Sequence, residues 1–196
     1  MMNDLTLCEA LKAHSRTTHD AVDALVMSMQ PFASQDNYRK FLQAQYEFHR
    51  AVRPIYDNAE LRAAFVSEQG GLVSLSRLGR VEQDMANLGV TPFETAITVP
   101  SYTDTEAIGW LYCVEGSNVG AAILYKEAGK IELDEGFGAT HLAAHADGRM
   151  PHWRNVKACL NAILLSESDR QAAMKGADDA FAYFKQLIRT IYSVAA

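Results

Sequence analysis

Glycines interrupt a predicted helix over residues 109–126, GWLYCVEGSNVGAAILYK. A glycine in a helix interior costs about 1 kcal/mol relative to alanine, so these positions need a reason. Gly116 and Gly120 lie one turn apart on the same face, and Ser117 and Ala121 beside them add almost no side chain. Such a bare face suits either close packing of another backbone or a flat ligand lying on the helix. This stretch by itself leaves both alternatives open.

A second candidate group lies in the predicted helix over residues 5–27. Lys12 and His19 are seven residues apart and share nearly the same face, about 10 Å apart along the axis. A single histidine without a second protein ligand suits a macrocycle that already supplies four nitrogens to its iron. A planar macrocycle needs one ligated face and one nearly flat face, and its carboxylates need a nearby cation. Lys12 could supply that cation, and Gly116 with Gly120 the flat wall.

The remaining histidines are weaker candidates for a metal site. His141, His145 and His152 lie in or beside one long connection, where i, i+4 spacing imitates half of a zinc site. The sequence has no HExxH and no acidic ligand with matching spacing, so zinc is not favoured. It also lacks the paired Glu-x-x-His segments of a di-iron site, a Gly-rich phosphate loop and GxSxG.

Composition favours one helical domain. The 196 residues are 48% hydrophobic, enough for a single sizeable core, and good helix formers are common. The net charge of −6 argues against nucleic-acid binding, and an anionic ligand would need local cations. Cys8, Cys113 and Cys159 have no CxxC spacing, which is typical of reduced thiols in a cytoplasmic protein. No signal peptide and no uninterrupted apolar run of membrane-spanning length is found, so no membrane association is expected.

Apolar periodicity and end signals place the elements that carry these residues. They predict helices over 5–27, from Ser34 to Pro54, over 59–66, from Leu72 to Gly89, from Thr103 or Asp104 to Gly129, one with Pro151 in its first turn, and one over 167–193. In the helix after Pro151, the expected inward residues are Trp153, Val156, Leu160, Ile163 and Leu164. Residues 89–103 and 130–150 are expected to be long connections. The prediction is an all-α bundle of seven or eight helices in a single domain, residues 1–196.

Two segments resemble those of a known family. LKAHSRTTHDAVD, residues 11–23, resembles the proximal-helix signature of heme oxygenases. WLYCVEGSNVGAA, residues 110–122, resembles their distal-helix signature in its bacterial version. The spacing of the two segments and the chain length also agree, and the likeness covers nearly the whole chain. The resemblance therefore implies a heme oxygenase fold and heme oxygenase activity.

The resemblance also implies residue roles. His19 matches the proximal ligand of the heme iron, and Gly116 and Gly120 match the distal glycines whose backbone lies against heme. Lys12 and Tyr112 match residues that engage a heme propionate.

Further roles follow less directly from the resemblance. Lys126 is a further propionate candidate, as are Arg154 and Lys157. Ser117 stands where the animal enzymes have an aspartate, so with the two glycines it completes the expected catalytic set. Proton delivery would then run through water held by backbone groups and by Ser117 or Asn118.

The implied reaction uses heme as both cofactor and substrate. With O₂ and electrons from an external ferredoxin, flavodoxin or reductase, it would yield biliverdin, CO and ferrous iron. The Lys12 and Tyr112 pair matches the arrangement that yields biliverdin IXα. The chain itself has no flavin or nicotinamide motif. Nothing in the sequence requires more than a monomer, and iron acquisition and chromophore supply both remain open as its purpose.

Two other classes of protein compete with this interpretation. A heme storage or delivery protein would share the pocket without turnover, although such proteins more often fill the distal side with a second ligand. A helical relative of thiaminase type would use no heme. Its chemistry would have to be carried by Cys113 and Glu115 on the glycine-bearing helix.

Overall fold

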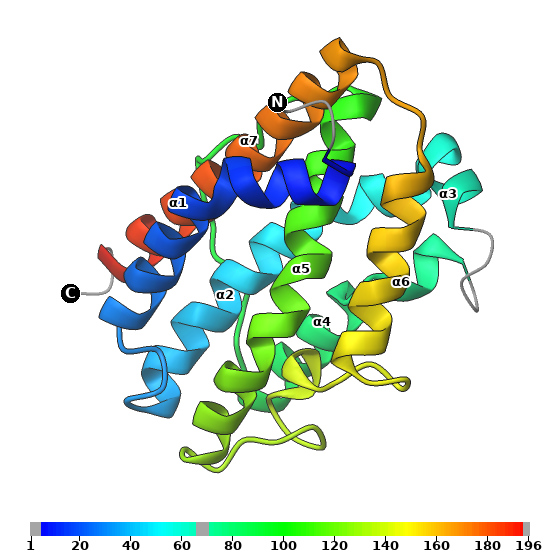
Figure 1. Cartoon of the computed structure of the whole chain (residues 1–196). Coiled ribbons are helices and arrows are strands. Elements are labelled where there is room, and N and C mark those ends of the chain that lie inside the picture. The colour runs from blue at the N-terminus through cyan, green and yellow to red at the C-terminus, as the bar shows by residue number, and fades with distance from the viewer. Residues whose placement is uncertain (1–4, 66–70, 194–196) are drawn as a thin grey trace.

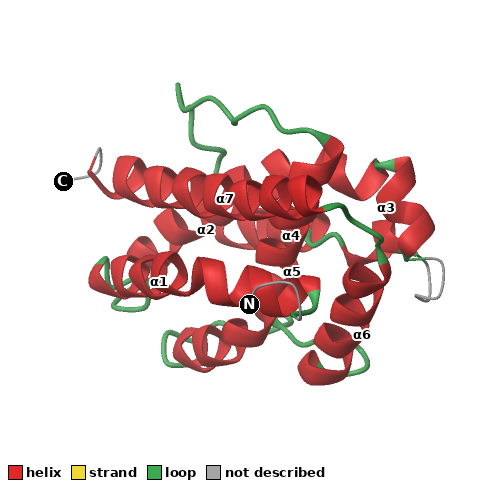
Figure 2. Ribbon diagram, turned by 45° about the horizontal axis from the view of Figure 1, so that its top comes forward, coloured by secondary structure: helices red, strands yellow, loops and turns green. Residues whose placement is uncertain are grey.

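Seven α-helices form the part of the chain that the computed structural model describes, residues 5–65 and 71–193 (Figure 1). They are α1 (Leu7–Ser28), α2 (Gln35–Val52), α3 (Ala59–Ala64), α4 (Leu78–Leu88), α5 (Asp104–Gly129), α6 (Arg149–Ala162) and α7 (Glu167–Ser193). Short 3₁₀ turns connect some of them: η1 (Arg53–Asp57), η2 (Leu72–Leu75) and η3 (Thr140–Leu142). Figure 2 shows helices and loops only, which confirms the all-α prediction for the described residues.

The backbones of α5 and α7 touch at the centre of the bundle. A Cβ built on Gly109 would overlap the carbonyl oxygen of Ala173, and one on Gly176 would overlap the carbonyl oxygen of Glu106. Close packing of another backbone therefore explains Gly109. Helix α1 also packs on α7, so α7 supports both helices that carry the predicted site.

Helix α5 is a core helix of unusual apolarity. By length and composition alone it could cross a membrane, because an 18-residue window has a mean hydropathy of 1.2. More than half of that window, 56%, is buried inside the fold, against α7 and α6 among others. Burial of this kind is typical of a core helix, and α5 is the single candidate of this kind in residues 5–65 and 71–193.

The predicted helix ends are largely confirmed. Ser34 caps α2 by accepting a hydrogen bond from the backbone N–H of Asn37, and Thr103 forms a capping box with Glu106 at the start of α5. Gly89 ends α4 in the left-handed conformation, with φ of 63°. Helix α2 ends two residues before Pro54, which lies inside η1.

The predicted start of the helix at Leu72 and the predicted burial of Leu164 are wrong. No continuous helix runs from Leu72, because η2 and α4 are separated by an extended Ser76, and the side chain of Arg77 turns inward to bind the carbonyl oxygens of His141 and Ala143. Leu164 does not face the core. It is 97% exposed, because α6 ends at Ala162 and the next residue is extended. The short helix predicted over 59–66 ends at residue 64, and residue 66 lies outside the described residues.

Candidate functional site

His19 lies on α1 with its side chain 54% exposed. The buried residues of α1 face the core, and His19 lies beside that stripe with its ring 6.0 Å from the Phe181 ring of α7, edge to face. Nδ1 of His19 lies 3.5 Å from Asp23 Oδ2 and 3.6 Å from Asp20 Oδ1. Since both carboxylates are on the Nδ1 side, Nε2 is the nitrogen left to bind a ligand.

The face of α5 that begins at Gly109 becomes uncovered further along the helix. A Cβ on Gly116 would lie 3.4 Å from the Trp153 ring, and a Cβ on Gly120 would meet nothing within 4 Å. One turn later Ile123 is 67% exposed. Helix α1 starts close to α5 and diverges from it toward its own end (Figure 1). An open, nearly flat strip of helix therefore remains at Gly116 to Gly120.

Helix α6 borders one edge of this strip. The Trp153 ring lies 5.4 Å from the Tyr112 ring, with Lys157 Nζ 5.9 Å from the indole centroid. Tyr112 is half-buried, and this burial raises the pKa of its phenol, so the group is a neutral donor. The structure thus brings Tyr112 and Gly116 together around a tryptophan.

The start of α1 reaches the same edge. The backbone N–H of Cys8 donates to Asn161 Oδ1 at 2.9 Å, and Cys8 Sγ lies 3.8 Å from the carbonyl oxygen of Lys157. Lys12 follows Cys8 by one helical turn. Lys12 therefore lies near the end of α1 that contacts α6.

The predicted cations are available to a ligand. Lys12, Lys126 and Arg154 are exposed, and none has an ion-pair partner within the described residues. In a chain of net charge −6, unpaired cations near an open apolar strip favour an anionic ligand. His19 lies apart from the Tyr112 group, on a different helix and with no ring contact to it.

The two polar residues beside the glycines differ in direction. Ser117 is exposed, and its Oγ donates to the carbonyl oxygen of Val114 at 2.7 Å. Asn118 is buried, and its Nδ2 donates to Glu115 Oε2 at 3.2 Å. Ser117 could therefore hold water at the strip, whereas the side chain of Asn118 is directed into the interior.

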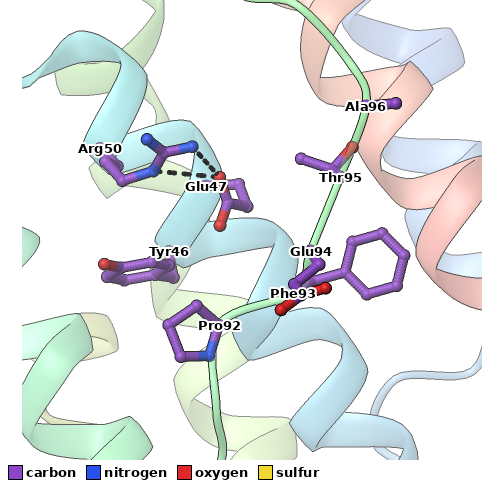
Figure 3. A pocket seen from close by; sticks show the side chains of 8 residues that line it. All are labelled: Tyr46, Glu47, Arg50, Pro92, Phe93, Glu94, Thr95 and Ala96. Atoms are coloured by element: carbon purple, nitrogen blue, oxygen red, sulfur yellow. Dashed lines mark hydrogen bonds and ion pairs between the residues drawn. The ribbon is translucent and has the colours of Figure 1, made fainter.

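A separate hollow of about 600 Å³ lies between α2 and the 89–103 connection (Figure 3). Its side chains include Tyr46, Phe93 and Glu47, and Glu47 is bound by Arg50. None of the predicted site residues lines it, so it does not coincide with the strip on α5.

Comparison with known proteins settles the family. A model of the family described as heme oxygenase matches residues 5–190. This chain belongs to the heme oxygenase family. It is 40% identical over 177 residues to heme oxygenase PigA of Pseudomonas aeruginosa, covering 89% of this chain and 87% of that protein. A heme oxygenase of Xanthomonas campestris is 30% identical over 108 residues, covering 55% and 64%.

The fold agrees with a solved heme oxygenase. The structure of the NO- and CO-bound heme oxygenase from Neisseria meningitidis superimposes with a TM-score of 0.91 at 44% identity. The match covers 96% of this chain and 93% of that one. The resemblance read from residues 11–23 and 110–122 is thereby confirmed. This heme oxygenase is an enzyme, and its family implies heme as substrate together with O₂.

The residues of the open strip fit a heme. A Cβ at Gly120 would occupy open space, so the helix backbone is accessible to a flat ring there. The exposed imidazole of His19 has its Nδ1 beside carboxylates, as an iron-binding histidine requires. Unpaired cations suit the two propionates.

The thiaminase-type alternative finds no support in these side chains. Cys113 is buried with its Sγ 3.7 Å from the carbonyl oxygen of Ala177, and burial raises the pKa of this thiol. A reactive cysteine needs a lowered pKa and access to its substrate. The Glu115 carboxylate is likewise enclosed, 1% exposed and bound by other side chains.

Sequence reasoning missed several residues around the strip and several polar pairs in the interior. Trp153 was expected to be only a core residue, because a partly buried aromatic at helical spacing has the same pattern as a core residue. Phe181 was grouped with the apolar face of the last helix for the same reason. The pairs His152–Glu115 and His141–Asp84 join residues far apart in the chain, at 2.8 and 2.7 Å, and no local motif marks them.

Proposed function

We propose that His19 of this heme oxygenase binds the heme iron through Nε2, with the strip at Gly116 to Gly120 against the opposite face of the macrocycle. The observation that supports this most directly is the uncovered strip itself. The same stripe of α5 is covered by the α7 backbone at Gly109 and meets nothing at Gly120. An interior glycine costs a helix about 1 kcal/mol relative to alanine, and the bare position gives a flat ligand room to approach the backbone.

When bound, heme supplies the iron that activates O₂ and is itself converted to biliverdin, CO and ferrous iron. The residues around it bind and orient. Asp23, whose Oδ2 lies 3.5 Å from Nδ1 of His19, orients the ring so that Nε2 faces the iron. Gly116 and Gly120 let the backbone approach closely, and Ser117 holds water on the oxygen side.

The propionates are anchored by Lys12 and Tyr112, with Lys126, Arg154 and Lys157 as further cations. Lys12 and Tyr112 lie toward the end of the strip where α1 meets α6. Anchoring at one end fixes how the macrocycle is turned in its plane and therefore which edge faces the oxygen. We infer that biliverdin IXα is the main product.

Electrons come from a separate ferredoxin, flavodoxin or reductase, because the chain has no motif for a flavin or nicotinamide. We place the protein in the cytoplasm as a monomer, with residues 1–196 acting as one heme oxygenase domain. The buried thiols of Cys8 and Cys113 are consistent with a reducing compartment.

The test is a hemin titration by absorbance, followed by a reductant in air. A Soret band that saturates at one heme per chain and then disappears, with growth of a broad red band of biliverdin, supports the proposal. The His19→Ala variant should bind hemin more weakly and lose turnover. A Soret band that stays stable under reductant and air would instead indicate a heme storage protein, and an absence of binding would exclude both.

A further inference from the structure

A buried carboxylate lies on α5 directly before the glycine strip. Glu115 is 1% exposed and accepts a hydrogen bond from Tyr56 Oη at 2.5 Å and one from His152 Nε2 at 2.8 Å. Asn118 Nδ2 donates a third at 3.2 Å. Because a carboxylate only accepts hydrogen bonds, each partner is the donor. Glu115 therefore joins η1 and α6 to α5.

The surroundings keep this cluster in one state. Burial raises the pKa of Tyr56 well above its ordinary value, and the Glu115 carboxylate beside it acts in the same direction, so Tyr56 remains a donor. Arg77, which is 5% exposed, places a balancing positive charge near Glu115. A buried carboxylate that accepts three hydrogen bonds holds its elements in a single arrangement.

Glu115 and His152 are each followed in the sequence by a residue that lies at the strip. His152 precedes Trp153, and Glu115 precedes Gly116. The Trp153 ring lies 3.4 Å from the place of a Cβ on Gly116 and 5.4 Å from the Tyr112 ring. The bond between Glu115 and His152 therefore fixes the indole at one edge of the open strip.

We propose that Glu115 is a positioning residue: by holding His152 it keeps the Trp153 indole at the edge of the strip and limits how far a bound heme turns in its plane. This inference rests on the proposed heme site. In this arrangement the Trp153 ring contacts the macrocycle at the end where Lys12 and Tyr112 are expected to bind the propionates. Loosening α6 would let the macrocycle turn and expose other edges to oxygen.

The first measurement uses protein without heme. The chain has two tryptophans, and Trp110 is fully buried, so acrylamide quenches mainly Trp153. Glu115→Ala should raise the quenching constant and shift the emission to longer wavelength. Glu115→Gln should restore most of the wild-type values. Its amide still accepts from Tyr56, and His152, whose Nδ1 has no partner in the described chain, can move its proton to Nδ1 and accept instead.

The second measurement is the ratio of biliverdin isomers after turnover, separated by HPLC. Glu115→Ala should lower the share of the main isomer several-fold relative to the others, with Glu115→Gln close to wild type. Asp84→Ala is the matched control, because it removes a second buried carboxylate, one that binds His141 and the backbone of Thr140 and is not hydrogen-bonded to His152. Its thermal stability should fall in the same way while its isomer ratio stays that of the wild type.

Two results would overturn the inference. One is unchanged Trp153 quenching in Glu115→Ala, and the other is an unchanged isomer ratio in a variant that still turns over heme. If circular dichroism shows that Glu115→Ala does not fold, both measurements are made on Tyr56→Phe. Smaller shifts in the same direction are expected for this variant, and the absence of any shift would overturn the inference. Wild-type protein that binds no heme would overturn the proposed function, which is a different outcome.

Discussion

At the scale of single residues, the proposed site depends on what surrounds His19. The imidazole is exposed on one side and faces two carboxylates on the other, with Asp23 Oδ2 the nearer at 3.5 Å. A carboxylate beside Nδ1 fixes the tautomer that leaves Nε2 free for iron and makes it a stronger ligand. In the proposed site, Asp23 would orient the histidine that binds the iron.

Asp23→Asn should weaken heme binding. Loss of an outer carboxylate of this kind typically costs about 10–100-fold in metal affinity, and we expect a rise of this order in the Kd for hemin. The ferrous iron–histidine stretching frequency in resonance Raman spectra should fall because the carboxylate beside Nδ1 is lost. Asp178→Asn is the control, because Asp178 pairs with His14 instead. Equal affinities for wild type and Asp23→Asn would exclude this role for Asp23.

Replacing the two propionate anchors should broaden the product mixture. In Lys12→Met with Tyr112→Phe, size is nearly kept while the charge and the phenol O–H are lost. HPLC of the extracted pigment should then show several biliverdin isomers in place of one dominant isomer. Lys40→Met is a control, since Lys40 lies over the Tyr192 ring on another part of the surface. An unchanged mixture would show that other groups orient the heme.

At the scale of elements, α5 uses its glycines for different purposes along one stripe. Gly109 allows contact with the α7 backbone, Gly116 meets the Trp153 ring, and Gly120 faces open space. Backbone packing explains Gly109, and the proposed heme would account for Gly120. The proposed heme strip lies on α5 beyond the turn at which the α7 backbone contacts Gly109.

This arrangement predicts effects of opposite sign for two alanine substitutions. Gly120→Ala meets no neighbour, so it should raise the stability of the heme-free protein by about 1 kcal/mol through helix propensity, while weakening heme binding. Gly109→Ala should destabilise the protein because its Cβ would overlap backbone atoms of Ala173 and Ala177. Thermal melts and hemin titrations measure both. A stabilised Gly120→Ala that binds hemin as tightly as wild type would contradict the proposed position of the heme.

Helix ends were predictable where a local signal decides them. Ser34, Thr103 and Gly89 act through their own side chain or backbone freedom, and each does what its type indicates. The start of α4 was not predictable, because it depends on Arg77 binding carbonyl oxygens 64 and 66 residues away. The apolar spacing from Leu72 continues across the break, so the pattern hides it.

At the scale of the whole molecule, several polar residues are buried in the interior. His49, Arg77, His141 and Glu115 are all 5% exposed or less. Burial, with the nearby charges of His141 and Arg77, lowers the pKa of His49 to about 3 from 6.5. The pKa of His141 is also lowered, mainly by burial. These imidazoles make folding depend on pH.

Stability should therefore decrease as the pH falls below about 6.5. Between the unfolded pKa of 6.5 and the folded value of about 3, the unfolded state binds the His49 proton and the folded state does not. The free energy of unfolding then falls with decreasing pH by up to about 1.4 kcal/mol per pH unit from this group. Urea denaturation between pH 7.5 and about 5 measures the slope.

The variant His49→Phe should flatten that slope, because the titrating group is gone while an aromatic ring remains. His14→Gln serves as control, since His14 is partly exposed and bound to Asp178, and its removal should leave the slope from His49 intact. A slope that persists unchanged in His49→Phe would assign the pH dependence to other groups.

The proposed site was predictable to the extent that it is encoded in two local segments. The two glycines are unusual inside a helix, and His19 is marked by the resemblance of residues 11–23 to the proximal-helix signature. Trp153 and Glu115 were not predicted as parts of the site, because their proposed roles depend on α6 packing against α5. A buried pair 37 residues apart, such as Glu115 and His152, becomes apparent only in three dimensions.

The most direct test of the central claim is a crystal structure of the protein with bound heme. The account predicts an iron bond to Nε2 of His19 of about 2.0–2.1 Å, as for other metal–imidazole bonds. It also predicts the macrocycle in van der Waals contact with the backbone of Gly116 to Gly120 and with the Trp153 ring at its edge. Heme bound elsewhere, for example in the hollow beside Glu47 and Phe93, or iron held by another side chain, would contradict it.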